Sequence, residues 1–360
     1  MEKLKLYNQE EMDQLRTRQD PLADLAVISL IESPDLAREI NGWNQIPDPL
    51  PSHFPKVLRE YFFFFQEAAE LADPDLLKKG QEFFSQTGDI YLGLLGFYSL
   101  PYCYAFGDGA QVLVRSKRIV DEIGIRLAET GYFVMELFKP GGFYKDQSPY
   151  LTCAKVRLIH AYSRYFISHY ATDWKVEYGA PINQEDMLGT NLAFSMIVLR
   201  GLTKMGYSIE SETFQLVLSY WKWLGALLGV DVKFWPESPK EAFELDRLIR
   251  KRHMKSTKAG KRLISALAEY YKHNIPDQIV RNQVDSLFSF FLGKEASQVL
   301  GISSEINLPG SLVDLIFKFS GWKNYGSKKT YQKIRSMMET QQKEQFGKLI
   351  QLQIPVLERS

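Results

Sequence analysis

Apolar residues recur every three or four positions along most of the 360-residue chain, which is the spacing of one face of an α-helix. The clearest stripes are Ile119, Ile123, Leu127 and Val134, and Leu216, Tyr220, Leu224 and Leu227. Alternation of apolar and polar residues, which is typical of strands, is scarce. Residues 110–115 and 230–235 could form short strands, but neither has a convincing hairpin partner. The pattern therefore predicts an all-α protein.

Capping signals predict where several helices begin. In five places a Ser or Asp stands directly before a proline, and this pairing suits the N-cap and the first helical position because proline has no N–H to leave unpaired. These pairs are Asp20-Pro21, Ser33-Pro34, Asp73-Pro74, Ser148-Pro149 and Ser238-Pro239. Glu241 adds a capping-box glutamate after Ser238. Asn183, followed by two acidic residues, predicts one more helix start.

The predicted helices form a single domain in three parts. A proline-rich loop, Pro47–Pro55, closes an N-terminal helical extension over residues 1–55. Residues 56–320 form the helical core, and residues 321–360 carry a charged C-terminal helix expected from about Ser327 to Leu352. The longest uncharged run, residues 90–107, contains Pro101 and three glycines. We interpret this run as a buried helix pair broken at the proline rather than as a membrane span.

Composition and motifs exclude several classes of protein. Hydrophobic residues make up 45% of the chain and the formal net charge is +1, so neither disorder nor a nucleic-acid partner is expected. Two cysteines cannot build a disulfide framework, and common zinc and nucleotide-binding motifs are absent. The N-terminus lacks the apolar segment of a secretory signal, so we expect a cytoplasmic protein. The basic run over residues 247–262 is interpreted as a solvated helix face and loop, with contact to phosphate or an anionic membrane as the alternative.

The helix expected over residues 116–138 carries polar side chains on its apolar face. Arg126 and Thr130 lie four positions apart on or beside the apolar stripe, and Glu129 lies near its edge. An arginine that faces a core is costly unless it meets an anion. The ordinary interpretation is an intramolecular salt bridge, or an arginine that extends to the surface.

The helix expected over residues 149–170 is apolar on several sides, so most of its circumference should be buried. His160 shares one stripe with apolar and small residues, and Arg157 and Arg164 flank that stripe. A neutral imidazole on such a face suits an axial ligand of haem iron, and the arginines could pair with haem propionates. A core histidine bonded to a backbone carbonyl or a carboxylate is the alternative. The other histidines have weaker settings: His53, His169, His253 and His273.

Five segments in a fixed order carry a family resemblance. They are DPLADLAVISL (20–30), RLAET (126–130), KVRLIHAYSR (155–164), GAPINQEDMLGTNLAFS (179–195) and YWKWLGALLGV (220–230). Their order resembles the family that joins the bacterial latex clearing proteins, or rubber oxygenases, with the fungal MpaB-type oxygenases. The resemblance implies a globin-like helical core around haem b. It implies that His160 is the axial iron ligand and that Arg126 and Thr130 help to hold the haem site.

The same resemblance implies a haem-dependent oxygenase that uses O2 on an apolar substrate, such as an isoprenoid or polyketide-like alkene. Rubber-cleaving members have a lysine directly before the threonine, where this chain has Glu129, a carboxylate that could act as an acid or base. They also have an upstream glutamate as proposed base, and the nearest acid here is Asp108. Rubber cleavage is therefore not expected.

Two alternatives stay open. One is a non-catalytic protein that binds haem or a lipid-like ligand, as a sensor or carrier. The other is a haem-free family member, in which an ion pair between Arg126 and Glu129 fills the cavity.

Overall fold

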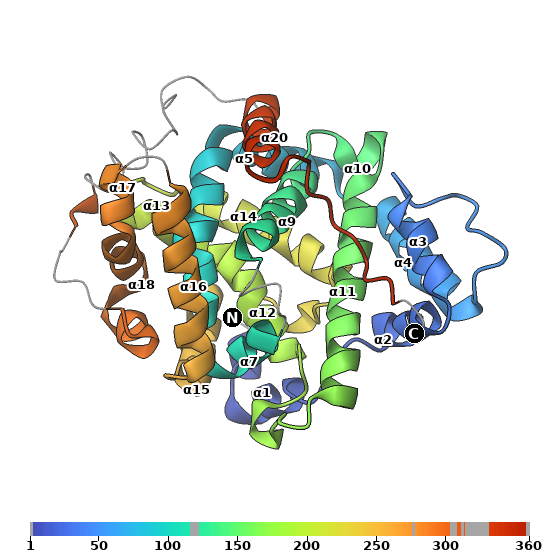
Figure 1. Cartoon of the computed structure of the whole chain (residues 1–360), viewed down its shortest axis with the longest axis horizontal. Helices are drawn as coiled ribbons and strands as arrows, with labels where there is room; N and C mark the ends of the chain where they lie inside the picture. Colours follow the sequence, from blue (N-terminus) through green and yellow to red (C-terminus); the bar gives the residue numbers. More distant parts are fainter. Residues whose placement is uncertain are drawn as a thin grey trace.

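The computed structural model describes residues 3–115, 122–275, 278–302, 308–310, 313 and 331–357. The described residues form a single all-helical domain without a strand, and their one β-contact is an isolated bridge between Phe106 and Met254. The prediction of an all-α single domain is confirmed. Helix α11 (Ser148–Tyr170) runs through the molecule, with α9 (Ile123–Leu137) and α14 (Ser211–Leu227) packed against it (Figure 1).

The remaining elements surround this centre. The N-terminal part contains η1 (Lys3–Leu6), α1 (Gln9–Leu15), α2 (Pro21–Glu32), α3 (Pro34–Asn41), α4 (Lys56–Glu70), α5 (Pro74–Leu94), η2 (Leu95–Ser99), α6 (Leu100–Tyr104) and α7 (Gly107–Arg115). The C-terminal part contains α10 (Gly142–Lys145), η3 (Val176–Tyr178), α12 (Gln184–Phe194), α13 (Met196–Lys204), η4 (Val232–Phe234), α15 (Pro239–His253), α16 (Lys258–Asn274), α17 (Gln278–Asn282), α18 (Val284–Leu300) and α20 (Tyr331–Phe346).

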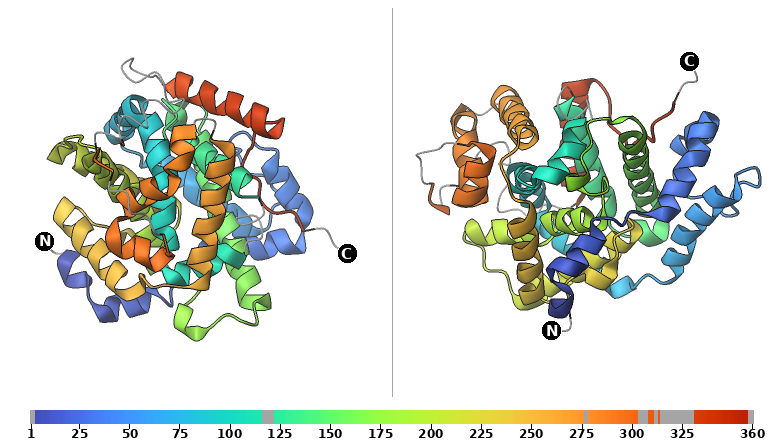
Figure 2. Two further views of the ribbon diagram at one scale, coloured as in Figure 1. Left: turned by 60° about the vertical axis from the view of Figure 1, so that its left-hand side comes forward. Right: turned by 90° about the horizontal axis from the view of Figure 1, so that it is seen from below.

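The N-terminal segment, expected as an extension, packs directly on the central helix. Helix α2 contacts both α4 and α11, and its Val27 and Leu30 are buried. Two further views show α2 and α4 side by side next to α11 (Figure 2). Burial of an apolar helix face against α11 makes residues 21–32 part of the main core.

Most of the predicted helix starts are found. Asp20, Asp73, Ser238 and Asn183 are N-caps whose side chains accept a backbone N–H, and Ser33 is an N-cap without such a bond. Ser148 is an exception, because it is the first residue of α11 and its hydroxyl donates to Glu136 instead. The two suggested strands are wrong: residues 110–115 belong to α7, and residues 230–235 contain the 3-10 turn η4. Six residues are too few for periodicity to separate these structures.

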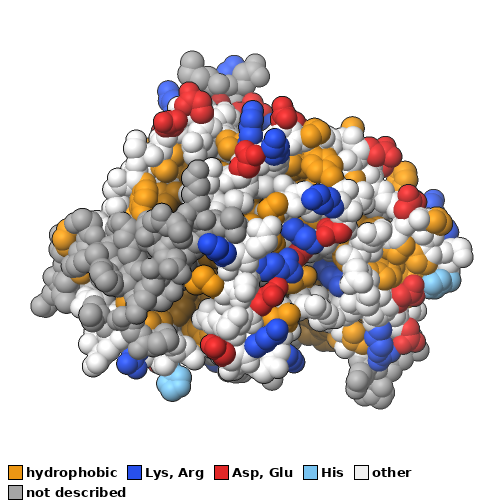
Figure 3. Space-filling view, turned by 90° about the horizontal axis from the view of Figure 1, so that it is seen from above, with side chains coloured by type: hydrophobic (Ala, Val, Ile, Leu, Met, Phe, Trp, Pro, Cys, Tyr) orange, Lys and Arg blue, Asp and Glu red, His pale blue; other side chains and the backbone are white. Residues whose placement is uncertain are grey.

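The predicted break of the uncharged run at Pro101 is wrong, because the chain stays helical from α5 through α6. Helix α5 continues into the π-helical turn η2, and Pro101 then lies in the first turn of α6, where its missing N–H is harmless. Among the described residues, no helix is both long and apolar enough to cross a membrane. On the face seen from above, acidic and basic side chains are interspersed with apolar ones (Figure 3).

The C-terminal helix is shorter than expected. Helix α20 ends at Phe346, whereas the predicted helix continues to Leu352; its predicted start at Ser327 lies outside the described residues. Gly347 follows the helix with φ of 70°, a conformation that glycine adopts easily. Residues 347–357, which we call the C-terminal strap, then run without regular structure past α11 (red in Figure 1).

Candidate functional site

A cavity of about 560 Å³ lies in the helical core, within the size range of small-molecule sites. Its wall is built from α6, α7, α9, α11, α12, α14 and α15, and Leu352 and Pro355 of the C-terminal strap complete it. Most of the lining side chains are aliphatic or aromatic, including Phe133, Phe166, Phe194 and Trp221. Such a wall favours an apolar ligand.

His160 lines this cavity from α11. Its buried Nδ1 atom has no hydrogen-bond partner among the described residues. Burial lowers the pKa of the imidazole to about 3, and the positive charges of Arg164 and Arg126 act in the same direction. His160 is therefore a neutral imidazole at physiological pH. The alternative interpretation expected a core histidine bonded to a carbonyl or a carboxylate, but Nδ1 makes no such bond among the described residues.

Three polar residues of α9 line the same cavity. The Nη1 atom of Arg126 lies 3.2 Å from Oε2 of Glu129, so the two side chains form an ion pair. The hydroxyl of Thr130 donates to the backbone carbonyl of Arg126 at 2.9 Å. The intramolecular salt bridge is thus present, as the ordinary interpretation expected. It does not fill the cavity, which remains open beside it.

Arg157 and Arg164 do not join His160 at the cavity. Arg157 holds the carboxylate of Asp20 with two hydrogen bonds of 2.6 and 2.8 Å, and Arg164 bonds to Asp24 at 2.6 Å. Neither arginine belongs to the cavity wall. The geometry therefore gives no support to the expectation that these two residues bind haem propionates. They connect α11 to α2 instead.

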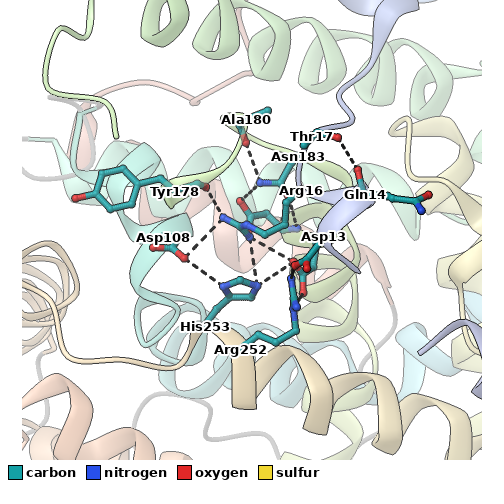
Figure 4. A network of polar contacts seen from close by, with 12 residues as sticks. Asp13, Gln14, Arg16, Thr17, Asp108, Tyr178, Ala180, Asn183, Arg252 and His253 are labelled. Atoms are coloured by element: carbon teal, nitrogen blue, oxygen red, sulfur yellow. Dashed lines mark hydrogen bonds and ion pairs between the residues drawn. The ribbon is translucent and has the colours of Figure 1, made fainter. Parts of the chain in front are cut away.

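A second polar cluster borders the cavity where α12 and α15 meet, and Figure 4 shows it. His253 lies between two carboxylates, with Nδ1 3.2 Å from Asp108 and Nε2 2.9 Å from Glu185. Only a protonated imidazole can donate from both nitrogens. Burial opposes the charged form of His253, but the bonds to Asp108 and Glu185 raise its pKa above the ordinary value. Arg16 lies beside this group, 3.4 Å from Nε2 of His253.

Asp186 extends the cluster to the cavity surface. Its Oδ1 accepts from Arg16 at 3.0 Å and its Oδ2 accepts from Asn183 at 2.8 Å. The side chain keeps 19% of its surface exposed while it lines the cavity. Burial raises the pKa of Asp186, whereas Arg16 opposes that shift. Within the described part of the chain, no group of three or more His, Cys, Asp or Glu side chains could hold a metal ion.

The sequence did not single out His253. The signal that could have found it is the four-residue spacing of Leu245, Ile249 and His253, which puts all three on one buried helix face. Because the neighbouring residues in sequence are basic, this spacing is easily overlooked. The prediction of a solvated face is wrong for this part of the run, because Arg252 and His253 are both ion-paired with Glu185. Of the other histidines, His53, His169 and His273 are exposed.

Fold and cavity together define a class: a single all-helical domain around an apolar cavity with a neutral, partly buried histidine in its wall. The family described as "ER-bound oxygenase mpaB/B'/Rubber oxygenase, catalytic domain" matches residues 104–308, and the chain belongs to this family of oxygenase catalytic domains. Its fold is similar to that of the latex clearing protein LCP in the closed state, with a TM-score of 0.71, 20% identity and 95% of each chain covered. No curated protein matches the chain. The resemblance inferred from the sequence is confirmed.

Proposed function

We propose that this protein is a haem b-dependent oxygenase that uses O2 on an apolar substrate, such as an isoprenoid or polyketide-like alkene. One observation carries the proposal: a neutral imidazole, His160, lines an apolar cavity and has an unpartnered Nδ1. A neutral imidazole is the form that ligates iron. Membership of an oxygenase family supports the reaction class.

The residues around the cavity fit haem b in part. His160 would hold the iron through a ring nitrogen, and Arg126 is the candidate arginine that reaches the cavity to meet a propionate. When bound, haem b supplies the iron on which oxygenase chemistry with O2 depends. The apolar wall would exclude water and hold the substrate. Arg157 and Arg164 take no part in this proposal, since Asp20 and Asp24 occupy them.

Glu129 and Thr130 are the proposed catalytic side chains. Glu129 is buried and forms an ion pair with Arg126. That carboxylate could accept a proton at Oε1 or Oε2 from a group in the cavity. The Thr130 hydroxyl donates to a backbone carbonyl, so its oxygen can still accept a hydrogen bond from a ligand.

The test is the absorbance spectrum of protein supplied with haem. We expect a Soret band in the wild type and its loss in His160→Ala. The matched control is His169→Ala, because His169 lies on the same helix but is exposed. A wild type without a Soret band, or a band that survives His160→Ala unchanged, would contradict the proposal.

The cavity would equally serve a carrier or sensor that binds an apolar ligand without turnover. Oxygen consumption separates the two functions. An oxygenase consumes O2 when isoprenoid or fatty-acid alkenes are added to haem-loaded protein, and a carrier does not.

A further inference from the structure

The cavity wall has two separate polar regions. One consists of Arg126, Glu129, Thr130 and His160, on α9 and α11. The other consists of Asp186 and His253, on α12 and α15. The rest of the wall is mainly aliphatic and aromatic. Asp186 presents a partly exposed carboxylate to this apolar cavity, and covering a carboxylate with a purely hydrocarbon ligand is costly, so this region indicates a polar group on the ligand.

Asp186 is the member of its region that can bind such a group. His253 is engaged at both ring nitrogens, by Asp108 and Glu185, and has no N–H left to offer. Asp186 accepts one bond at each oxygen, from Arg16 and Asn183. A carboxylate oxygen can accept a second bond, and part of this side chain is exposed at the cavity. Asp186 is therefore placed to accept a hydrogen bond from a donor on the ligand.

The charges of the cluster point to an uncharged donor. Its cations are Arg16, Arg252, Lys255 and the imidazolium of His253, and its anions are Asp13, Asp108, Glu185 and Asp186. These charges cancel. An ammonium or carboxylate group on the ligand would enter a region that is already neutral, where a buried charge without a counter-ion is strongly unfavourable.

We propose that the cavity binds an uncharged amphiphile, an apolar chain that carries a hydroxyl group, and that Asp186 accepts the hydrogen bond from this hydroxyl. The inference rests on the proposed function in one respect: it takes the ligand of this cavity to be the apolar substrate. It goes beyond that function by specifying a hydroxyl group on the substrate and by naming Asp186 as the residue that recognises this group.

Calorimetric titration of the haem-supplied protein tests the inference with four probes of one chain length. Decan-1-ol carries the donor, decyl methyl ether lacks only the donor, and decanoate and decylamine carry charges. We expect decan-1-ol to bind about tenfold more tightly than the ether, because a hydrogen bond to a charged group is stronger than a neutral one. We expect neither charged probe to bind more tightly than the ether.

Two variants locate the effect. Asp186→Asn should reduce the preference for decan-1-ol over the ether to about threefold, because the remaining bond is between neutral groups. It should also improve decanoate binding relative to the ether, since the cluster gains one net positive charge. Asp246→Asn is the matched control: Asp246 is buried and ion-paired with Arg200, but it does not line the cavity. It should leave every ratio unchanged.

Each outcome decides between the proposals. Equal binding of decan-1-ol and the ether overturns the hydroxyl inference and leaves the apolar-ligand function standing. The same holds if Asp186→Asn and Asp246→Asn alter the ratios alike. If none of the four probes binds, the apolar-ligand function fails together with the inference. The wild-type series needs no variant, so the inference stays testable even if Asp186→Asn does not fold.

Discussion

Arg157 and Asp20 form a buried ion pair with two hydrogen bonds, Nε to Oδ2 at 2.6 Å and Nη2 to Oδ1 at 2.8 Å. Each side chain is only 7% exposed. Arg164, two turns further along α11, approaches the same carboxylate at 3.9 Å. His160 lies between the two arginines on this helix. The helix that carries the proposed haem ligand is therefore attached to α2 and its N-cap on both sides of His160.

We expect Asp20→Asn to lower the free energy of unfolding by about 3–5 kcal/mol, because it leaves the buried guanidinium of Arg157 without a counter-ion. Asparagine keeps the ability to cap α2, so the loss reports mainly on the ion pair. Urea denaturation followed by circular dichroism measures the change. Asp35→Asn is the control, because Asp35 pairs with Arg38 at the surface and is 91% exposed. It should cost less than about 1 kcal/mol. Similar losses in both variants would contradict the assigned role.

The raised pKa of His253 predicts a pH-dependent contribution to stability. Its neighbours are Asp108 on α7, Glu185 on α12 and Arg16 after α1. Because the folded pKa exceeds the unfolded value of about 6.5, the stabilisation is complete below pH 6.5 and is lost as the pH rises through the folded pKa. His253→Gln should therefore be most destabilised relative to wild type at pH 6 and least at pH 9.

Urea denaturation at pH 6, 7.5 and 9 measures this difference. Burial lowers the pKa values of Lys155 and of the half-buried Lys204 to about 8, but both lysines titrate in both proteins and cancel in the comparison. The exposed His169→Gln should show a constant difference from wild type. A deficit of His253→Gln that grows as the pH rises would refute the assignment.

Arg126 should contribute to haem binding if the proposed function is correct. We expect Arg126→Gln to weaken haem affinity about tenfold, because it removes a charge-assisted hydrogen bond to a propionate. Absorbance titration with haem measures the affinity. Arg247→Gln is the control, since Arg247 is exposed and pairs with Glu244 on its own helix. Unchanged affinity in Arg126→Gln would mean that Arg126 serves only its ion pair with Glu129.

The side chain of Asn41 makes two hydrogen bonds to the C-terminal strap. Asn41 donates to the carbonyl of Ile354 at 2.9 Å and accepts its N–H at 2.8 Å. We expect Asn41→Ala to speed hydrogen exchange of the Ile354 amide about tenfold, because both bonds are lost together. Gln345→Ala removes a surface amide that bonds to Tyr270, and should not change this amide. Unchanged exchange in Asn41→Ala would show that the apolar contacts of the strap hold it alone.

Local rules explain what could be predicted from the sequence. The caps at Asp20, Asp73, Ser238 and Asn183 depend on side chains and backbone a few residues apart, so the sequence displays them directly. Helical periodicity predicted the fold class for the same reason. Placing His160, Arg126 and Thr130 at one cavity needed the family resemblance, because periodicity does not say which helices meet.

Long-range pairing explains what could not be predicted. Arg157 and Arg164 were correctly found unusual for an apolar helix, but their partners lie 137 and 140 residues earlier in the chain. Nothing local distinguishes such a carboxylate from a haem propionate. His253 was overlooked because its carboxylates come from α7 and α12, while its neighbours in sequence are basic.

The ion pairs of α11 also limit how far the protein can be truncated from its N-terminus. The family match begins at residue 104, well after the carboxylates that neutralise α11. A fragment trimmed to residues 104–308 would keep Arg157 and Arg164 but lose Asp20 and Asp24, so both cations would lose their counter-ions. We therefore expect a stable fragment to need more of the chain than the family match covers. Any shortened version meant to retain the cavity has to begin before Asp20.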